Sequence, residues 1–223
     1  MGIISLEHID NLFWLGRYTE RVYTTLRLYF ESYDAMIDLM GEEYRTFCER
    51  IDIPDIYGSA DEFKARYPFD TEDANSIISN MTRAYDNSII MREILGSEAL
   101  SYIQMAIYDI QVAKKSESPL ISLQEVIDHI LAFWGIMDDE VDNPQVRNVI
   151  KAGKRIERID LYARLNMDGS KIIRELKRLA PRVEQSGMRY HKEYLDEIEE
   201  LAKADAVDYY RIVSLIENLI ITM

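Results

Sequence analysis

Cysteine, proline, glycine and histidine are all scarce in this chain of 223 residues, which has one, five, nine and three of them. A single cysteine, Cys48, excludes an intrachain disulfide and a metal site built from several cysteines, and it fits a reducing compartment. The three histidines are scattered, and the repeated Glu-x-x-His pattern of di-iron bundles is lacking. We therefore expect no metal site, and we interpret Cys48 as a structural thiol.

Glycine-rich phosphate loops and long apolar runs are also lacking. Without a phosphate loop, the chain is not expected to hydrolyse ATP alone, and no cofactor is predicted. Its first residues lack the basic start and apolar run of a signal peptide, and no run approaches the roughly 18 apolar residues needed to span a bilayer. The most apolar tail, residues 215–223, is interpreted as a docked helix. We expect a cytoplasmic protein that does not enter the membrane.

Positive charge is in deficit, with 26 basic against 40 acidic residues and a formal net charge of −14. Nucleic-acid binding is disfavoured, because it depends on basic side chains that displace counterions from phosphates. The charge is uneven, however, since residues 151–192 hold 12 Lys or Arg and 5 Asp or Glu. This segment either pairs with acidic helices of the same fold or holds an anion.

Leucine, isoleucine, methionine, glutamate, arginine and tyrosine are abundant and recur at spacings of three and four residues. This pattern predicts an all-α, multi-helix bundle, and the length fits a single domain over residues 1–223. Helices are expected over 5–40, 41–50, 70–95 and 97–115, with irregular chain over 51–70. Further helices are expected from Ser122, whose capping box includes Glu125, and from Asn143-Pro144, with later breaks near residues 168–170, 186–187 and 205.

One segment of the first helix occurs twice. Residues 11–22 (NLFWLGRYTERV) return as residues 148–159 (NVIKAGKRIERI), and both copies contain the pattern Gly-x-x-x-Glu-Arg. The glycines are Gly16 and Gly153, and the glutamates are Glu20 and Glu157. A glycine inside a helix costs about 1 kcal/mol relative to alanine, so two at matching positions indicate that another backbone or a ligand comes close.

A crossing of the two copies about a pseudo-twofold axis would bring their charged residues together. Glu20 would then face Arg158, and Glu157 would face Arg21. Three further arginines would lie nearby: Arg17, Arg27 and Arg164. Such buried pairs can fix helix register without any chemistry, but clusters of carboxylates and arginines also form substrate or anion sites in helical bundles. The sequence leaves both interpretations open.

Three segments of the chain resemble the signature blocks of the bacterial alpha-E domain family. They are residues 14–21 (WLGRYTER), residues 75–77 with 84–93 (NSI and AYDNSIIMRE), and residues 153–158 (GKRIER). The resemblance implies an all-helical protein without an established activity. It also implies gene neighbours that encode ATP-grasp ligases and transglutaminase-like cysteine peptidases, and hence a system that makes or trims amide bonds in a peptide.

By this resemblance Glu20 and Glu157 match the signature glutamates, and other motif positions are matched by Arg17, Arg21, Asn87, Arg92 and Arg158. One function class is a noncatalytic helical partner that binds an ATP-grasp-type ligase, a transglutaminase-like protein or a peptide ligand; this is the prediction we favour. The alternative is an enzyme of amide or peptide metabolism in which Glu20 or Glu157 is the general base and an arginine stabilises an oxyanion. The candidate binding residues are Arg17, Arg21, Asn87, Arg92, Arg158 and Arg164. A homo-oligomer is left open.

Overall fold

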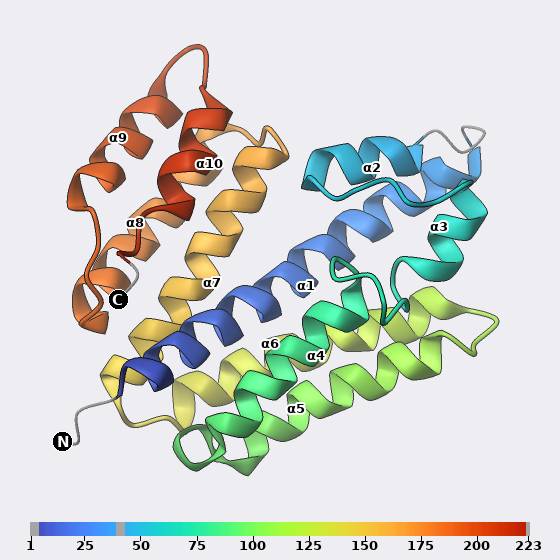
Figure 1. Ribbon diagram of the computed structural model, residues 1–223, viewed down its shortest axis with the longest axis horizontal. Helices are drawn as coiled ribbons and strands as arrows, with labels where there is room; N and C mark the ends of the chain where they lie inside the picture. The colour runs from blue at the N-terminus through green and yellow to red at the C-terminus, as the bar shows by residue number, and fades with distance from the viewer. Residues whose placement is uncertain (1–4, 39–42, 222–223) are drawn as a thin grey trace. The chain divides into compact units, whose positions relative to one another are not determined.

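The computed structural model describes residues 5–38 and 43–221, and within them every regular element is a helix (Figure 1). The all-α prediction is therefore confirmed. The helices are α1 (Leu6–Asp38), α2 (Glu43–Ile51), α3 (Ala60–Arg66), α4 (Ile77–Ile90), α5 (Arg92–Ala113), α6 (Pro119–Asp139), α7 (Pro144–Arg164), α8 (Gly169–Ser186), α9 (Lys192–Lys203) and α10 (Tyr209–Glu217).

Several helix ends follow the predicted sequence signals. The side chain of Asn143 accepts hydrogen bonds from the backbone N–H of Gln145 and Val146. Pro144 occupies the first position of α7, where the backbone N–H that proline lacks would have no partner within the helix. Gly187 ends α8 in a left-handed conformation, with φ +78°. These capping groups satisfy backbone donors and acceptors that the helix itself leaves unpaired.

Other boundaries differ from the prediction. The segment expected to be irregular contains α3, a short helix capped by the Ser59 hydroxyl. The next helix begins after Ser76 and not at residue 70, and α6 begins after Ser118 and not at Ser122. The hydroxyl of Ser76 accepts a capping bond from the N–H of Ser79, whereas α6 begins with Pro119 and Ser118 makes no side-chain capping bond. The predicted end of the first helix at residue 40 and its stop at Gly41 lie outside the described residues.

The chain forms two compact units, which we describe separately. In the first unit, which takes residues 5–20 and 141–221, α7 and α8 form a hairpin, α9 packs on α8, and α10 packs on α7. Buried apolar side chains of α7, α8 and α10 form its core, among them Val149, Leu179 and Leu215. The C-terminal helix α10 therefore packs within this unit, but it ends at Glu217. Residues 218–221, which were expected to continue a docked helix, include a bridge between Ile220 and Tyr190, and residues 222–223 lie outside the described chain.

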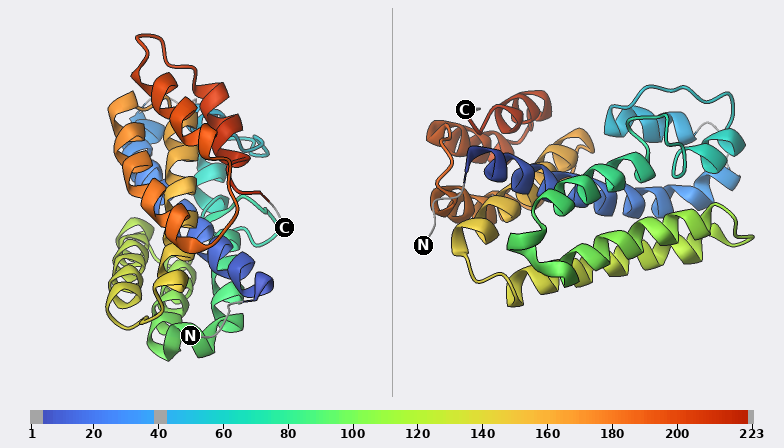
Figure 2. Two further views of the ribbon diagram at one scale, coloured as in Figure 1. Left: turned by 90° about the vertical axis from the view of Figure 1, so that its left-hand side faces the viewer. Right: turned by 60° about the horizontal axis from the view of Figure 1, so that its bottom comes forward.

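The second unit takes residues 21–38 and 43–140 of the described chain. Its α5 and α6 lie side by side as a hairpin, and α4 packs on α5 (Figure 2). At its other end, aromatic rings from α1, α2 and α3 pack together, with Phe63 stacked on Tyr67 and the Phe47 ring edge-on to both. The division into two units leaves the predicted single domain over residues 1–223 untested.

Within the described residues, α6 is the one helix long and apolar enough to cross a membrane by length and composition. The sequence analysis did not single it out. Its apolar side chains include Leu123, Ile130 and Phe133, all buried in the hairpin with α5. A core helix of a bundle passes the same test. Only 39% of this window is buried, and Ile121 and Leu131 are exposed, so packing accounts for part of the apolar composition of α6.

Candidate functional site

The two copies of the repeated segment cross at their glycines, on α1 and α7 of the first unit. A Cβ atom on Gly16 would lie 2.1 Å from the carbonyl oxygen of Ile150, and a Cβ on Gly153 would lie 2.1 Å from the carbonyl oxygen of Phe13. Each glycine thus meets the residue three positions before the other glycine. This reciprocal contact is the pseudo-twofold crossing that the repeat predicts, and it requires glycine at both positions.

Glu20 lies one turn beyond this crossing and is fully buried. Its carboxylate accepts two hydrogen bonds from Arg158, from Nε to Oε1 at 2.6 Å and from Nη2 to Oε2 at 2.9 Å. Burial alone would lower the pKa of Arg158, but the charge and hydrogen bonds of Glu20 raise it above its usual range. This is the predicted Glu20–Arg158 pair in bidentate geometry, the strongest form of this interaction.

Glu157, the equivalent residue in the second copy, is 1% exposed. It accepts a hydrogen bond from Nε of Arg17 at 2.7 Å, so the first copy supplies an arginine that the sequence had only placed nearby. The Nη2 atom of Arg17 also lies 3.8 Å from Asp160, whose other carboxylate oxygen accepts from Arg164 at 3.0 Å. Arg164 in turn bonds Glu217 of α10 at 2.6 Å. Arg17 and Arg164 therefore belong to one buried charge network.

Lys154 occupies the position in the second copy that Arg17 occupies in the first. It is half-buried, and burial lowers its pKa to about 7; the charge of Glu20 opposes this shift, while Arg158 and Arg155 reinforce it. The ammonium and neutral forms of Lys154 are therefore both populated near neutral pH. Matching positions of the two copies consequently carry different charges at this pH.

A further buried carboxylate, that of Glu175 on α8, accepts hydrogen bonds from arginines of the basic segment. Arg155 of α7 bonds its Oε2 at 2.5 Å, and Arg178 bonds its Oε1 at 2.8 Å. The sequence analysis missed Glu175, although a signal was present: it interrupts the apolar stripe of Ile172, Leu176 and Leu179. Together with the pairing of Arg158 to Glu20, this favours the interpretation of residues 151–192 as a segment that pairs within the fold.

The remaining candidate residues lie in the second unit. Asn87 is half-buried on α4, Arg92 is exposed at the start of α5, and Arg21 is half-buried on α1. Their roles in binding stay predictions. Cys48 is buried on α2, and burial is the main cause that raises the pKa of its thiol to about 12. A thiol with this pKa is almost entirely protonated at neutral pH and is a poor nucleophile.

Carboxylates and histidines of the described residues do not gather into a metal site, because no group of three or more His, Cys, Asp or Glu lies close enough together there. His129, which the sequence places one turn after Glu125, pairs instead with Asp109 of α5 through Nε2 at 2.8 Å. That contact joins two helices of a hairpin and has a structural explanation.

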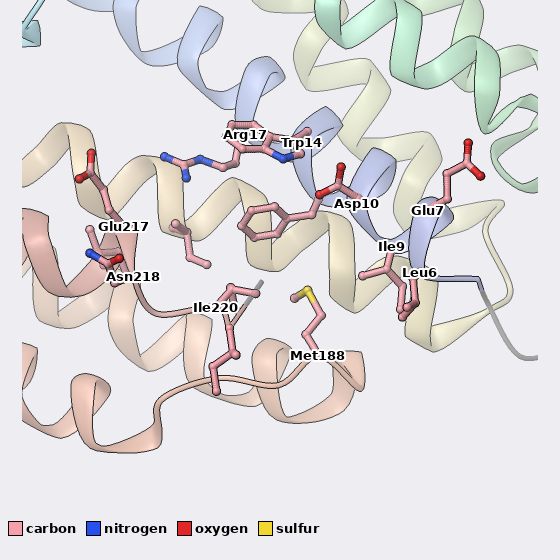
Figure 3. Close-up of a pocket in the computed structure, with 14 residues that line it drawn as sticks. Leu6, Glu7, Ile9, Asp10, Trp14, Arg17, Met188, Glu217, Asn218 and Ile220 are labelled. Atoms are coloured by element: carbon pink, nitrogen blue, oxygen red, sulfur yellow. The ribbon is translucent and has the colours of Figure 1, made fainter. Parts of the chain in front are cut away.

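A cavity of about 390 Å³ adjoins the charge network in the first unit (Figure 3). Its walls come from α1, α7, the segment after α8 and the C-terminal segment. The lining residues include Phe13, Trp14, Arg17, Met188, Glu217 and Ile220. Arg17 is the lining residue that also bonds a buried glutamate of the repeat. Sequence reasoning missed this cavity, because its walls are far apart in the chain.

The fold and this site define an all-α protein in which two copies of one helical segment cross at reciprocal glycines and are held by buried Glu–Arg pairs. The chain belongs to the Alpha-E family, described as a predicted alpha-helical domain with a conserved ER motif, because the family model matches residues 7–211. The Glu-Arg dipeptides of the two repeat copies, at 20–21 and 157–158, lie within the matched residues. Among curated proteins and among solved structures, nothing matches the chain.

Proposed function

We propose that this protein is a noncatalytic helical partner in a system that makes or trims amide bonds in a peptide, acting with an ATP-grasp-type ligase and a transglutaminase-like peptidase. The observation that carries the proposal is the state of the repeated glutamates. Glu20 and Glu157 are 0% and 1% exposed, and each accepts a hydrogen bond from an arginine of the other copy. They act as a charge lock between α1 and α7.

The chemistry of general bases supports this reading over an enzymatic one. A general base must reach the proton that it removes, either directly or through one water. The described cavity is lined by Arg17 and not by Glu20 or Glu157, and the arginine bonds favour the ionised, fully paired carboxylate. Removing one partner of such a buried pair costs stability because the other charge is left uncompensated.

The proposal of these two partners rests on the resemblance to alpha-E proteins, which implies gene neighbours that encode ATP-grasp ligases and transglutaminase-like peptidases. A ligase and a peptidase that act on one peptide need that peptide to be held or passed between them, and a helical protein with an open cavity can supply this binding. We place this activity in the cytoplasm, where ATP for the ligase is present. The enzymatic alternative keeps one supporting observation, since Arg17 joins Glu157 to the cavity.

The test compares Glu20→Gln and Glu157→Gln with the wild type by urea unfolding and by pull-down of the ligase and peptidase encoded beside the gene. We expect each variant to lose about 3–5 kcal/mol of the free energy of unfolding, because Arg158 or Arg17 loses its buried counterion. Pull-down should fall only in proportion to the folded fraction. Glu184→Gln, at an exposed position of α8, is the matched control and should unfold as the wild type does.

Variants that keep wild-type stability but abolish turnover of the peptide would contradict the charge lock and favour the enzyme. A wild-type chain that captures neither neighbouring protein would overturn the proposed partnership.

A further inference from the structure

The cavity beside Arg17 has a rigid frame. The N–H of Ile221 donates to the carbonyl of Arg189 at 2.9 Å, and the N–H of His191 donates to the carbonyl of Leu219 at 2.9 Å. These bonds pair the C-terminal segment with the segment after α8 as a short antiparallel bridge. The bridge holds Met188 and Ile220 opposite the first turns of α1. A volume of about 390 Å³ lies within the range of small-ligand pockets.

The two ends of the cavity differ in chemistry (Figure 3). Around one end lie Arg17, Glu217 and Asn218, whose polar atoms come from α1 and α10 with its C-terminal extension. Towards the other end lie the apolar side chains of Met188 and Ile9, and the same stretch of α1 carries the carboxylates of Glu7 and Asp10. A ligand that fills both ends therefore has a polar group that donates and accepts hydrogen bonds, joined directly to an apolar group.

The guanidinium of Arg17 can donate one hydrogen bond to such a ligand. Its side chain is 10% exposed, its Nε–H is used by Glu157, and its face lies 5.1 Å from the centre of the Trp14 ring. Among the described residues, Nη1 has no hydrogen-bond partner. Because Arg17 lines the cavity, Nη1 is a donor that an acceptor oxygen of a ligand there can use.

The charge balance decides what kind of oxygen this is. The carboxylates that line the cavity or bond its lining arginine outnumber the guanidinium groups; they are Glu7, Asp10, Glu157, Asp160 and Glu217, against Arg17 and its neighbour Arg164. The local potential is therefore negative and disfavours a ligand carboxylate. A ligand with a neutral carbonyl oxygen that accepts a hydrogen bond from Nη1 of Arg17, and with a cationic group near the lining carboxylates, fits both the free donor and the negative potential.

We propose that this cavity binds an α-ammonium group with its adjacent amide carbonyl and an apolar side chain, as found in an apolar aminoacyl amide or at the N-terminus of a peptide. The carbonyl oxygen accepts from Arg17, and the ammonium lies near Glu217, while Asp10 adds negative potential from the other side of the cavity. The side chain packs against Phe13 and Met188. This inference deepens the proposed function, since it names the part of the peptide that is held.

The test is calorimetric titration of the purified full chain with leucinamide, in the absence of ligase and peptidase. Leucinamide should bind about tenfold more tightly than N-acetyl-leucinamide, which lacks the ammonium, and more tightly than glycinamide, which lacks the apolar group. It should also bind more tightly than free leucine, whose carboxylate is repelled. Equal affinity for N-acetyl-leucinamide, or tighter binding of free leucine, would overturn the proposal, as would failure of leucinamide to bind.

A second arm separates the two sources of this chemistry. A longer peptide amide with N-terminal leucine that binds at least as tightly as leucinamide indicates a peptide end, whereas binding of leucinamide alone indicates a small aminoacyl amide. Both results support the site. Asp10→Asn, an exposed position, should weaken leucinamide binding about threefold without changing the melting temperature. Glu184→Gln is the control outside the cavity and should bind as the wild type does.

The outcome is independent of the partner experiment. Loss of leucinamide binding would leave capture of the ligase and peptidase unaffected, so failure of the ligand site and failure of the partnership are distinguishable.

Discussion

At the crossing of α1 and α7, the two copies of the repeat place their backbones alike and their charges differently. Gly16 and Gly153 meet equivalent carbonyls at the same 2.1 Å from a hypothetical Cβ. One turn later, Glu20 is held by two bonds from Arg158, whereas Glu157 is bonded by Arg17, whose equivalent in the second copy is Lys154. The close backbone contact allows only glycine at these two positions. The arginine that pairs with each glutamate, by contrast, can come from different positions of the other copy. The first copy also borders the cavity, and Arg17 is one of its lining residues.

The most severe way to break the symmetry is to add a methyl group at the crossing. Gly16→Ala and Gly153→Ala should each cost about 3 kcal/mol of the free energy of unfolding, because the new Cβ would overlap a backbone oxygen. Urea unfolding measures this cost. Gly135→Ala on α6 is the matched control: its Cβ would meet nothing within 4 Å, so better helix propensity should stabilise the protein by about 0.5–1 kcal/mol.

The double variant at the crossing should cost less than the sum of the single variants, because both methyl groups force the same two helices apart. Strict additivity would show that the two glycines do not share one contact.

A milder change removes the titrating charge at Lys154 and makes the charge difference from Arg17 independent of pH. Its pKa is about 7 in the folded chain and about 10.4 when unfolded, so between these values the unfolded state binds more protons and stability rises with pH. The limiting slope is about 1.4 kcal/mol per pH unit, reduced by the partial exposure of the side chain. Lys154→Met should therefore be more stable than the wild type at pH 7. The difference in free energy of unfolding between the two proteins should become smaller by pH 10.

Urea unfolding at several pH values measures this difference, and the comparison with the variant cancels the groups that titrate in both proteins. A gap that stays constant from pH 7 to pH 10 would show that Lys154 is fully charged in the folded state at neutral pH.

The smallest effect is expected where a charge pair lies outside the crossing. Lys203 and Glu199 form an ion pair at 2.6 Å on α9, with side chains 58% and 33% exposed. Solvent and salt screen such pairs. Glu199→Gln should have the melting temperature of the wild type by calorimetry, which sets the baseline for the buried pairs. A loss comparable to that of Glu20→Gln would show that burial is not what distinguishes the crossing.

Much of the fold could be predicted from the sequence, because its signals are local. Asn143-Pro144 and Gly187 mark helix ends through their local backbone conformation and capping bonds. The crossing of the two helices could be predicted because Gly16 and Gly153 occupy matching positions of the repeat. The predicted start of α6 at Ser122 was wrong, because the helix begins at Pro119, whose fixed φ and missing N–H suit the first helical position even though Ser118 makes no side-chain capping bond.

The candidate site could be predicted only in part. The Glu20–Arg158 pair follows from the repeat, since equal spacing on two crossing helices determines which residues meet. The bond from Arg17 to Glu157 depends on side-chain rotamers at the crossing, which the repeat does not specify. The cavity depends on a bridge between Tyr190 and Ile220, a contact that leaves no periodic pattern in the sequence.

The first unit is discontinuous in the chain, and this has a consequence for synthesis. Residues 21–140 of the second unit are consecutive in the chain. In the first unit, the contact between Gly16 and Gly153 can form only after the ribosome has added 137 more residues. Chains emerge from the ribosome N-terminus first, and contacts between distant segments form slowly because a long loop must close. The second unit therefore has its whole sequence before α7 exists. During that interval the apolar face of the first turns of α1 is not yet covered by α7.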